Sequence, residues 1–138
     1  MAALWSCPRC GRVFRRPNLP HSCGVGSRSE MLKGKPEPLV KLYRALERHV
    51  KAWGGVEIVA KKRYALLRTT RVFADLVFMK DTLRLAILLD REVRKPLFFK
   101  IGRMSAHRVA HVAKLRSLGE LHAVLPYLKE AYRFAQHE

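Results

Sequence analysis

Apolar residues in the second quarter of the chain recur at steps of three and four, which is the spacing of one face of an α-helix. The series runs from Leu39 to Trp53, and two glycines at Gly54 and Gly55 follow it directly. Before it, a Lys-Pro-Glu-Pro sequence places a proline and an acidic residue where a helix begins. The pattern predicts an amphipathic helix that the glycines end.

After these glycines, the chain changes to short runs rich in Val, Ile, Leu and Phe, separated by charged and turn-forming residues. The runs predict strands over residues 56–60, 64–70, 72–80, 83–89 and 97–101, arranged as an antiparallel meander. The strands are apolar enough to require a helical cover on at least one face.

The segment from residue 104 to residue 118 allows two interpretations. His107, His111 and Leu115 have helical spacing, yet Val109, His111 and Ala113 also share one face of a strand. We favour a strand over residues 108–115, because Ser-Leu-Gly-Glu then gives a natural entry to a last helix. Helical spacing of apolar residues predicts this helix over residues 121–135.

The elements together predict an α+β fold, an antiparallel β-sheet flanked by an N-terminal and a C-terminal helix. Residues 25–35 are rich in Gly, Ser and charge and have no apolar period, which indicates a linker. We therefore divide the chain into a zinc-knuckle-like segment at 5–24, a linker at 25–35 and an α+β domain at 36–138.

Charge is the strongest compositional signal. The 138 residues include 28 Lys and Arg against 11 Asp and Glu, a net charge of +17. This balance is typical of proteins that bind polyanions, nucleic acid above all, although a solubilising surface would give the same number. No apolar run is long enough for a membrane span and the N-terminus lacks the pattern of a signal peptide, so we expect a cytoplasmic protein with no membrane partner.

All three cysteines lie within the first two dozen residues. Cys7 and Cys10 form a C-x-x-C pair, and His21 and Cys23 follow around a single serine. In a reducing compartment an odd, clustered set of thiols favours a metal over disulfides. Three thiolates and one imidazole suit a structural Zn²⁺, and a closed set of four leaves no position for catalysis. Free thiols are the alternative.

Two groups of basic residues are candidates for binding nucleic acid or another anion. The first surrounds the metal ligands and consists of Arg9, Arg12, Arg15 and Arg16. The second lies between the first predicted strands, at their ends, and consists of Lys61, Lys62, Arg63 and Arg71. The alternative for the first group is solvation of the knuckle, and for the second the protection of a sheet edge.

Several stretches together resemble a known family. They include WSCPRCGRVF, LKGKPEPLVKLYRALERHV, KKRYALLRTTRVFADLVFMKDTLRLAILL and SAHRVAHVAKLRSLGELHAVLPYLKEAY. The chain resembles small bacterial proteins that contain the domain of unknown function 5655, over about residues 5–134. The family has no assigned reaction, so the resemblance implies nearly nothing about activity. Related copies look like accessory domains joined to other modules.

No constellation of catalytic residues is visible. The acids are few and scattered, and no nucleotide-binding glycine pattern is present. We therefore expect no catalytic residues and favour a non-enzymatic module that binds nucleic acid. The alternative is a ligand-binding or accessory domain whose pocket, formed by Tyr64, Phe73 and His111, holds a small anion. For His111 itself we favour a packed or hydrogen-bonded structural role over this pocket role.

Overall fold

The computed structural model describes residues 5–6, 13–14, 28–61 and 63–136. Its helices are α1 (Arg28–Leu32), α2 (Glu37–Trp53) and α3 (Leu118–Gln136). The strands of its main sheet are β3 (Glu57–Ala60), β4 (Tyr64–Arg68), β5 (Val72–Phe78), β6 (Leu83–Leu89), β7 (Phe98–Ser105) and β8 (Arg108–Leu115). Two short strands near the N-terminus, β1 (Trp5–Ser6) and β2 (Val13–Phe14), pair with each other in antiparallel fashion.

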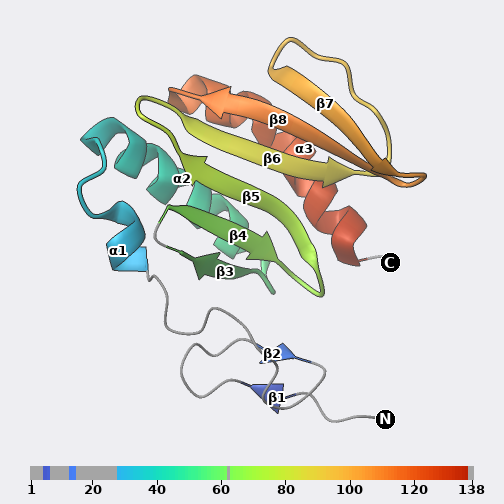
Figure 1. Cartoon of the computed structure of the whole chain (residues 1–138), viewed down its shortest axis with the longest axis horizontal. Coiled ribbons are helices and arrows are strands. Elements are labelled where there is room, and N and C mark those ends of the chain that lie inside the picture. Colours follow the sequence, from blue (N-terminus) through green and yellow to red (C-terminus); the bar gives the residue numbers. More distant parts are fainter. Residues whose placement is uncertain (1–4, 7–12, 15–27, 62, 137–138) are drawn as a thin grey trace.

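The main sheet is six-stranded and antiparallel, in the order β3-β4-β5-β6-β8-β7. Helices α2 and α3 pack against one another and against the same face of the sheet, and Figure 1 looks onto the other face. The strands alternate between buried and half-buried residues, as in Leu83–Leu89, because alternate side chains point to opposite faces. The α+β class and the strand at residues 108–115 are confirmed.

The predicted meander is wrong for the last two strands. β8 lies between β6 and β7, so the chain crosses over β8 before it forms β7 at the sheet edge. The connection is held in place by Val93, whose side chain is buried and whose N–H donates to His111 Nε2 on β8 at 2.8 Å. The pattern of apolar residues predicts where strands form but not which strands are neighbours. The position of β8 between β6 and β7 could therefore not be predicted from it.

Part of the predicted linker is packed onto the domain. Residues 28–32 form helix α1, and its Met31 is fully buried in the core. Arg28 Nε lies 2.9 Å from Glu47 Oε2, and the Tyr43 hydroxyl donates to the same oxygen at 2.8 Å. Burial opposes ionisation of Glu47, but the hydrogen bonds from Arg28 and Tyr43 outweigh it and lower the pKa of that carboxyl. This network joins α1 to α2.

The C-terminus of α2 is fixed to α3 by one tyrosine. Gly54 and Gly55 have φ angles of 86° and 69°, which favour glycine and end the helix as predicted. The Tyr132 hydroxyl lies 2.8 Å from the Trp53 carbonyl oxygen and 2.7 Å from that of Gly54. Its ring centroid lies 5.4 Å from that of Trp53 and 5.8 Å from that of Phe73. The single proton of the Tyr132 hydroxyl is thus shared between two carbonyl oxygens at the end of the helix, where backbone acceptors lack helical partners.

Within the described part of the chain, none of the helices combines the length and the apolar content that a membrane span requires.

Replacing Tyr132 by Phe should lower the free energy of unfolding by about 1 kcal/mol, because the ring contacts remain and only the hydrogen bond is lost. Urea denaturation followed by circular dichroism measures the change. Tyr64→Phe is the matched control, since the Tyr64 side chain is 40% exposed on the other face of the sheet. Equal midpoints for the two variants would contradict this role of the Tyr132 hydroxyl.

Candidate nucleic-acid interface

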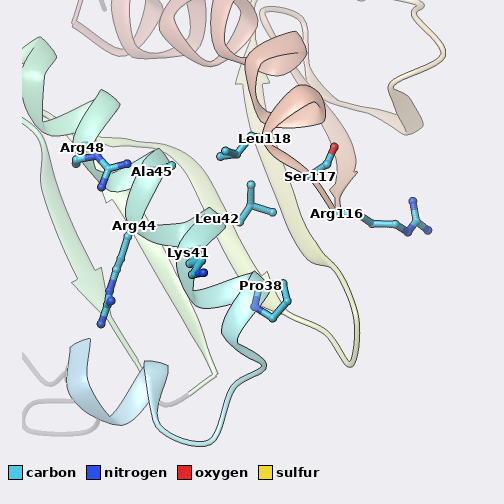
Figure 2. A pocket seen from close by; sticks show the side chains of 9 residues that line it. All are labelled: Pro38, Lys41, Leu42, Arg44, Ala45, Arg48, Arg116, Ser117 and Leu118. Carbon is cyan, nitrogen blue, oxygen red and sulfur yellow. The ribbon is translucent and has the colours of Figure 1, made fainter.

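A groove lies where α2 meets the start of α3. It encloses about 520 Å³. Its walls and floor consist of Pro38, Lys41, Leu42, Arg44, Ala45, Arg48, Arg116, Ser117 and Leu118 (Figure 2). We call it the basic groove, because four of these nine residues are cationic and none is acidic.

Helix α2 provides three of the four cations. Lys41, Arg44 and Arg48 are exposed and follow one another at steps of three and four, so they share one side of the helix. The seven helical steps from Lys41 to Arg48 span about 10 Å, roughly the axial length of three nucleotides in one DNA strand. Among the described residues, no carboxylate lies within ion-pair distance of these three side chains. Their charge is therefore available to a ligand.

The other wall is the junction between β8 and α3. The Ser117 hydroxyl accepts the backbone N–H of Glu120 at 3.2 Å, and a Glu120 carboxylate oxygen accepts the N–H of Arg116 at 2.7 Å. These two bonds form a reciprocal cap of the kind common at helix starts. The carboxylate also lies 4.0 Å from the Arg116 guanidinium, which leaves that side chain 59% exposed. The cap fixes the backbone of Arg116 at the start of α3.

The predicted basic group on the strands does not form one cluster. Lys61 is only 7% exposed, and Arg63 lies in a separate depression of about 400 Å³ together with Glu30, Lys33 and Lys35. Lys62 lies outside the described residues. Lys61 and Arg63 are close together in the sequence, but in the turn between β3 and β4 the first is buried and the second lines the surface depression.

Arg71 lies at the C-terminal end of α3. Its guanidinium donates to the Phe134 carbonyl at 3.4 Å and lies 4.6 Å from the centroid of the Phe134 ring. The neighbouring Thr70 hydroxyl donates to the Ala135 carbonyl at 3.0 Å. A cation at this end of a helix also interacts favourably with the helix dipole. In the structure Arg71 thus contacts the protein itself.

The three residues of the predicted pocket lie apart from one another. Tyr64 is exposed on the face that the helices leave open. Phe73 is buried against Tyr132, because a register shift adds one residue to β5 there and directs both Phe73 and Ala74 into the core. His111 is fully buried beneath α3, with its ring centroid 5.0 Å from that of Phe98.

The hydrogen bonds of His111 define its charge state. Nε2 accepts the Val93 N–H, so the proton of the neutral ring is on Nδ1, which lies 3.0 Å from the Val109 carbonyl oxygen. Burial lowers the pKa of His111, and the bond to Val109 offsets part of this effect. The residue is therefore a neutral structural histidine that joins the crossover connection to β8.

The predicted zinc ligands and the arginines beside them lie outside the described residues. Among the residues that the structure describes, no group of His, Cys, Asp and Glu side chains is arranged to hold a metal ion.

The sequence profile described as Domain of unknown function (DUF5655) matches residues 29–135, most of the chain. The chain belongs to this family. No curated protein and no solved structure gives a significant match. The resemblance found in the sequence is thus confirmed for the α+β domain of this DUF5655 member.

The basic groove of this DUF5655 protein was not predicted from the sequence. A signal was present, because Lys41, Arg44 and Arg48 occupy the polar side of a predicted helix. Such a stripe is usually only solvated, however, and Arg116 is far from it in the sequence. Only the packing of α3 against α2 makes the fourth cation part of the same surface.

The buried neutral His111 predicts a pH-dependent stability. Because its pKa is lowered in the folded state, the unfolded chain binds more protons below about pH 6.5. The contribution of His111 to the free energy of unfolding is fully present above that pH. It falls as the pH decreases, by at most about 1.4 kcal/mol per pH unit. Urea midpoints between about pH 7.5 and pH 5.5 measure this dependence.

His111→Gln should show a shallower dependence of stability on pH than the wild type, whatever its absolute stability. His107→Gln changes an exposed histidine of the β7–β8 turn and is the control, with an unchanged slope. If His111→Gln and the wild type have the same slope, the assignment of a neutral buried imidazole is wrong.

Proposed function

We propose that this DUF5655 protein is a non-enzymatic module that binds a polyanion, nucleic acid, and that the basic groove contacts its phosphates. One observation supports this proposal above the others. The lining of the groove includes four cations and no acid, and Lys41, Arg44 and Arg48 have no carboxylate partner within the described structure. Phosphates that replace their counterions would bind with a strong dependence on salt.

The apolar part of the groove fits the same ligand. Leu42 and Ala45 form its floor, and Leu118 is 53% exposed at its rim. Sugars present apolar surface between successive phosphates, so cations around an apolar floor can contact a strand continuously. Contacts of this kind position a nucleic acid without reading its sequence, and we therefore expect little sequence preference.

The chemistry of the lining supports binding over catalysis. The nine residues provide no carboxylate, imidazole or thiol, and their one hydroxyl, that of Ser117, accepts a hydrogen bond in the cap of α3. General acid–base or nucleophilic catalysis needs such groups in convergent positions. The proposed role of the protein is therefore to hold its ligand.

We also propose that the N-terminal segment holds a structural Zn²⁺ through Cys7, Cys10, His21 and Cys23. The donors fit this ion, since three thiolates and an imidazole are borderline-soft ligands. The paired strands also fit, because β1 ends directly before Cys7 and β2 begins shortly after Cys10. In this proposal the metal positions Arg9, Arg12, Arg15 and Arg16 as additional phosphate contacts.

Replacing Arg44 and Arg48 together by Gln should weaken binding of fluorescein-labelled DNA and RNA and reduce its salt dependence. For two lost phosphate contacts, the slope of log K against log salt should decrease by about 1.4 to 1.8. Fluorescence anisotropy over a series of salt concentrations measures both quantities. Absence of any binding by the wild type at low salt would rule out the proposed function.

The matched control is Arg91→Gln with Arg133→Gln. It removes the same net charge, but near the C-terminal end of α3, where Arg91 pairs with Glu130 at 2.8 Å. Its slope should remain that of the wild type. An equal decrease in both variants would show that net charge, and not the groove, determines binding. If inorganic phosphate displaces the labelled nucleic acid when its concentration equals that of the nucleic-acid phosphate groups, the groove is instead a site for a small anion.

Purified wild-type protein should contain about one zinc ion per chain by elemental analysis. Cys10→Ala should contain far less, because a site with three ligands binds Zn²⁺ more weakly. His107→Ala removes a histidine that lies outside the proposed ligand set and should keep full occupancy. A wild-type protein that remains free of metal after zinc addition under reducing conditions would contradict the site.

A further inference from the structure

Phe99 is the most exposed of the Phe, Tyr and Trp residues within 28–61 and 63–136, with 51% of its surface accessible. Its position results from a β-bulge. Phe98 pairs with Ala113 and Lys100 with Val112, so Phe99 is an extra residue in β7. Phe98 points into the core, where its ring contacts that of Tyr127, while Phe99 and Lys100 are both exposed. Bulges redirect side chains in this way, often beside functional sites.

Two cations accompany the exposed ring. Lys114 Nζ lies 4.8 Å from its centroid and Arg84 Cζ lies 5.9 Å from it. Arg84 and Lys114 are direct partners on β6 and β8, and the neighbours of Arg84 in β6, Leu83 and Leu85, are buried in the core. Phe99 is therefore on the face of the sheet opposite to the helices, the face seen in Figure 1.

The strands around Phe99 are strongly basic. Strands β5, β6, β7 and β8 include one acid, Asp75, and five cations: Arg84, Lys100, Arg103, Arg108 and Lys114. Asp75 is half-buried two strands away from β8, and burial raises the pKa of its carboxyl. The charge of this region of the sheet is thus complementary to an anionic ligand.

A hollow of about 430 Å³ borders the ring. Its lining combines Phe99 with polar residues of the crossover connection, Glu92, Arg94 and Lys95, and with Phe98 and Ile101. The volume lies within the range of small-ligand sites. Phe99 is therefore bordered by a hollow with polar groups as well as by the two cations.

We propose that Phe99 stacks on an unpaired base of a single-stranded nucleic acid, whose phosphates contact Lys114 and Arg84. An exposed aromatic ring next to cations is the usual platform for such strands, since every base presents a π-face. A duplex hides the faces of its bases, so this site prefers single strands. The inference rests on the proposed function in taking nucleic acid as the ligand, but it concerns a second surface on the opposite side of the sheet from the basic groove.

The test compares a labelled single strand of about 15 nucleotides with the duplex of the same sequence. Phe99→Ala should weaken binding of the single strand by about 5- to 150-fold, the usual effect of losing one stacked base, and leave duplex binding unchanged. Phe99→Leu keeps apolar surface and should behave like Phe99→Ala, while Phe99→Trp should restore binding. A 2-aminopurine base in the strand should be quenched by the wild type and not by Phe99→Leu.

Met104→Ala is the control, because it removes an apolar side chain of the same strand that is 70% exposed. It should bind both ligands as the wild type does. If the wild type binds nucleic acid but Phe99→Ala and Phe99→Leu both bind the single strand as tightly as the wild type does, this inference fails and the proposed function stands. If the wild type binds neither ligand, both fail. A wild-type dimer that Phe99→Ala dissociates would assign the ring to self-association and overturn the inference.

Discussion

Burial of one face of the sheet is the constraint on which the rest of the structure depends. Six antiparallel strands present Leu, Ile, Phe and Ala side chains to α2 and α3. These two helices lie on that face of the sheet and not on the other. Two helices on one face must meet, and Tyr132 joins them by hydrogen-bonding to the end of α2. The basic groove lies along the line where they meet, so it is a product of the same packing.

A buried histidine contributes to the edge of the sheet. The bond from Val93 to His111 holds the crossover connection against β8 and so allows β7 to lie at the outer edge. A bulge costs less in an edge strand than in a central strand. In a central strand it would interrupt the hydrogen bonds to two neighbouring strands, and at the edge it interrupts those to one. At the edge, the bulge can present Phe99 and Lys100 to solvent while Phe98 remains in the core.

The charges of the molecule fall into two classes. Some cations serve the fold, such as Arg28 bound to Glu47, Arg71 at the end of α3 and Arg91 bound to Glu130. Others, such as Arg44 and Arg48, lie on surfaces where the described structure gives them no carboxylate partner. Net charge alone does not separate these classes, and the high positive charge is therefore a weaker argument for nucleic acid than the composition of the groove.

The sequence by itself determined most of the elements, with the exception of α1 in the predicted linker. Helical spacing from Leu39 to Trp53 predicted α2, and short β-branched and apolar runs predicted the strands, because local periodicity reflects burial of one face. It also set the basic charge and the family. Only the tertiary structure decided that β8 separates β6 from β7, that His111 is a core residue and that Arg116 joins the cations of α2. These outcomes depend on contacts between residues far apart in the chain, which a periodic pattern does not encode.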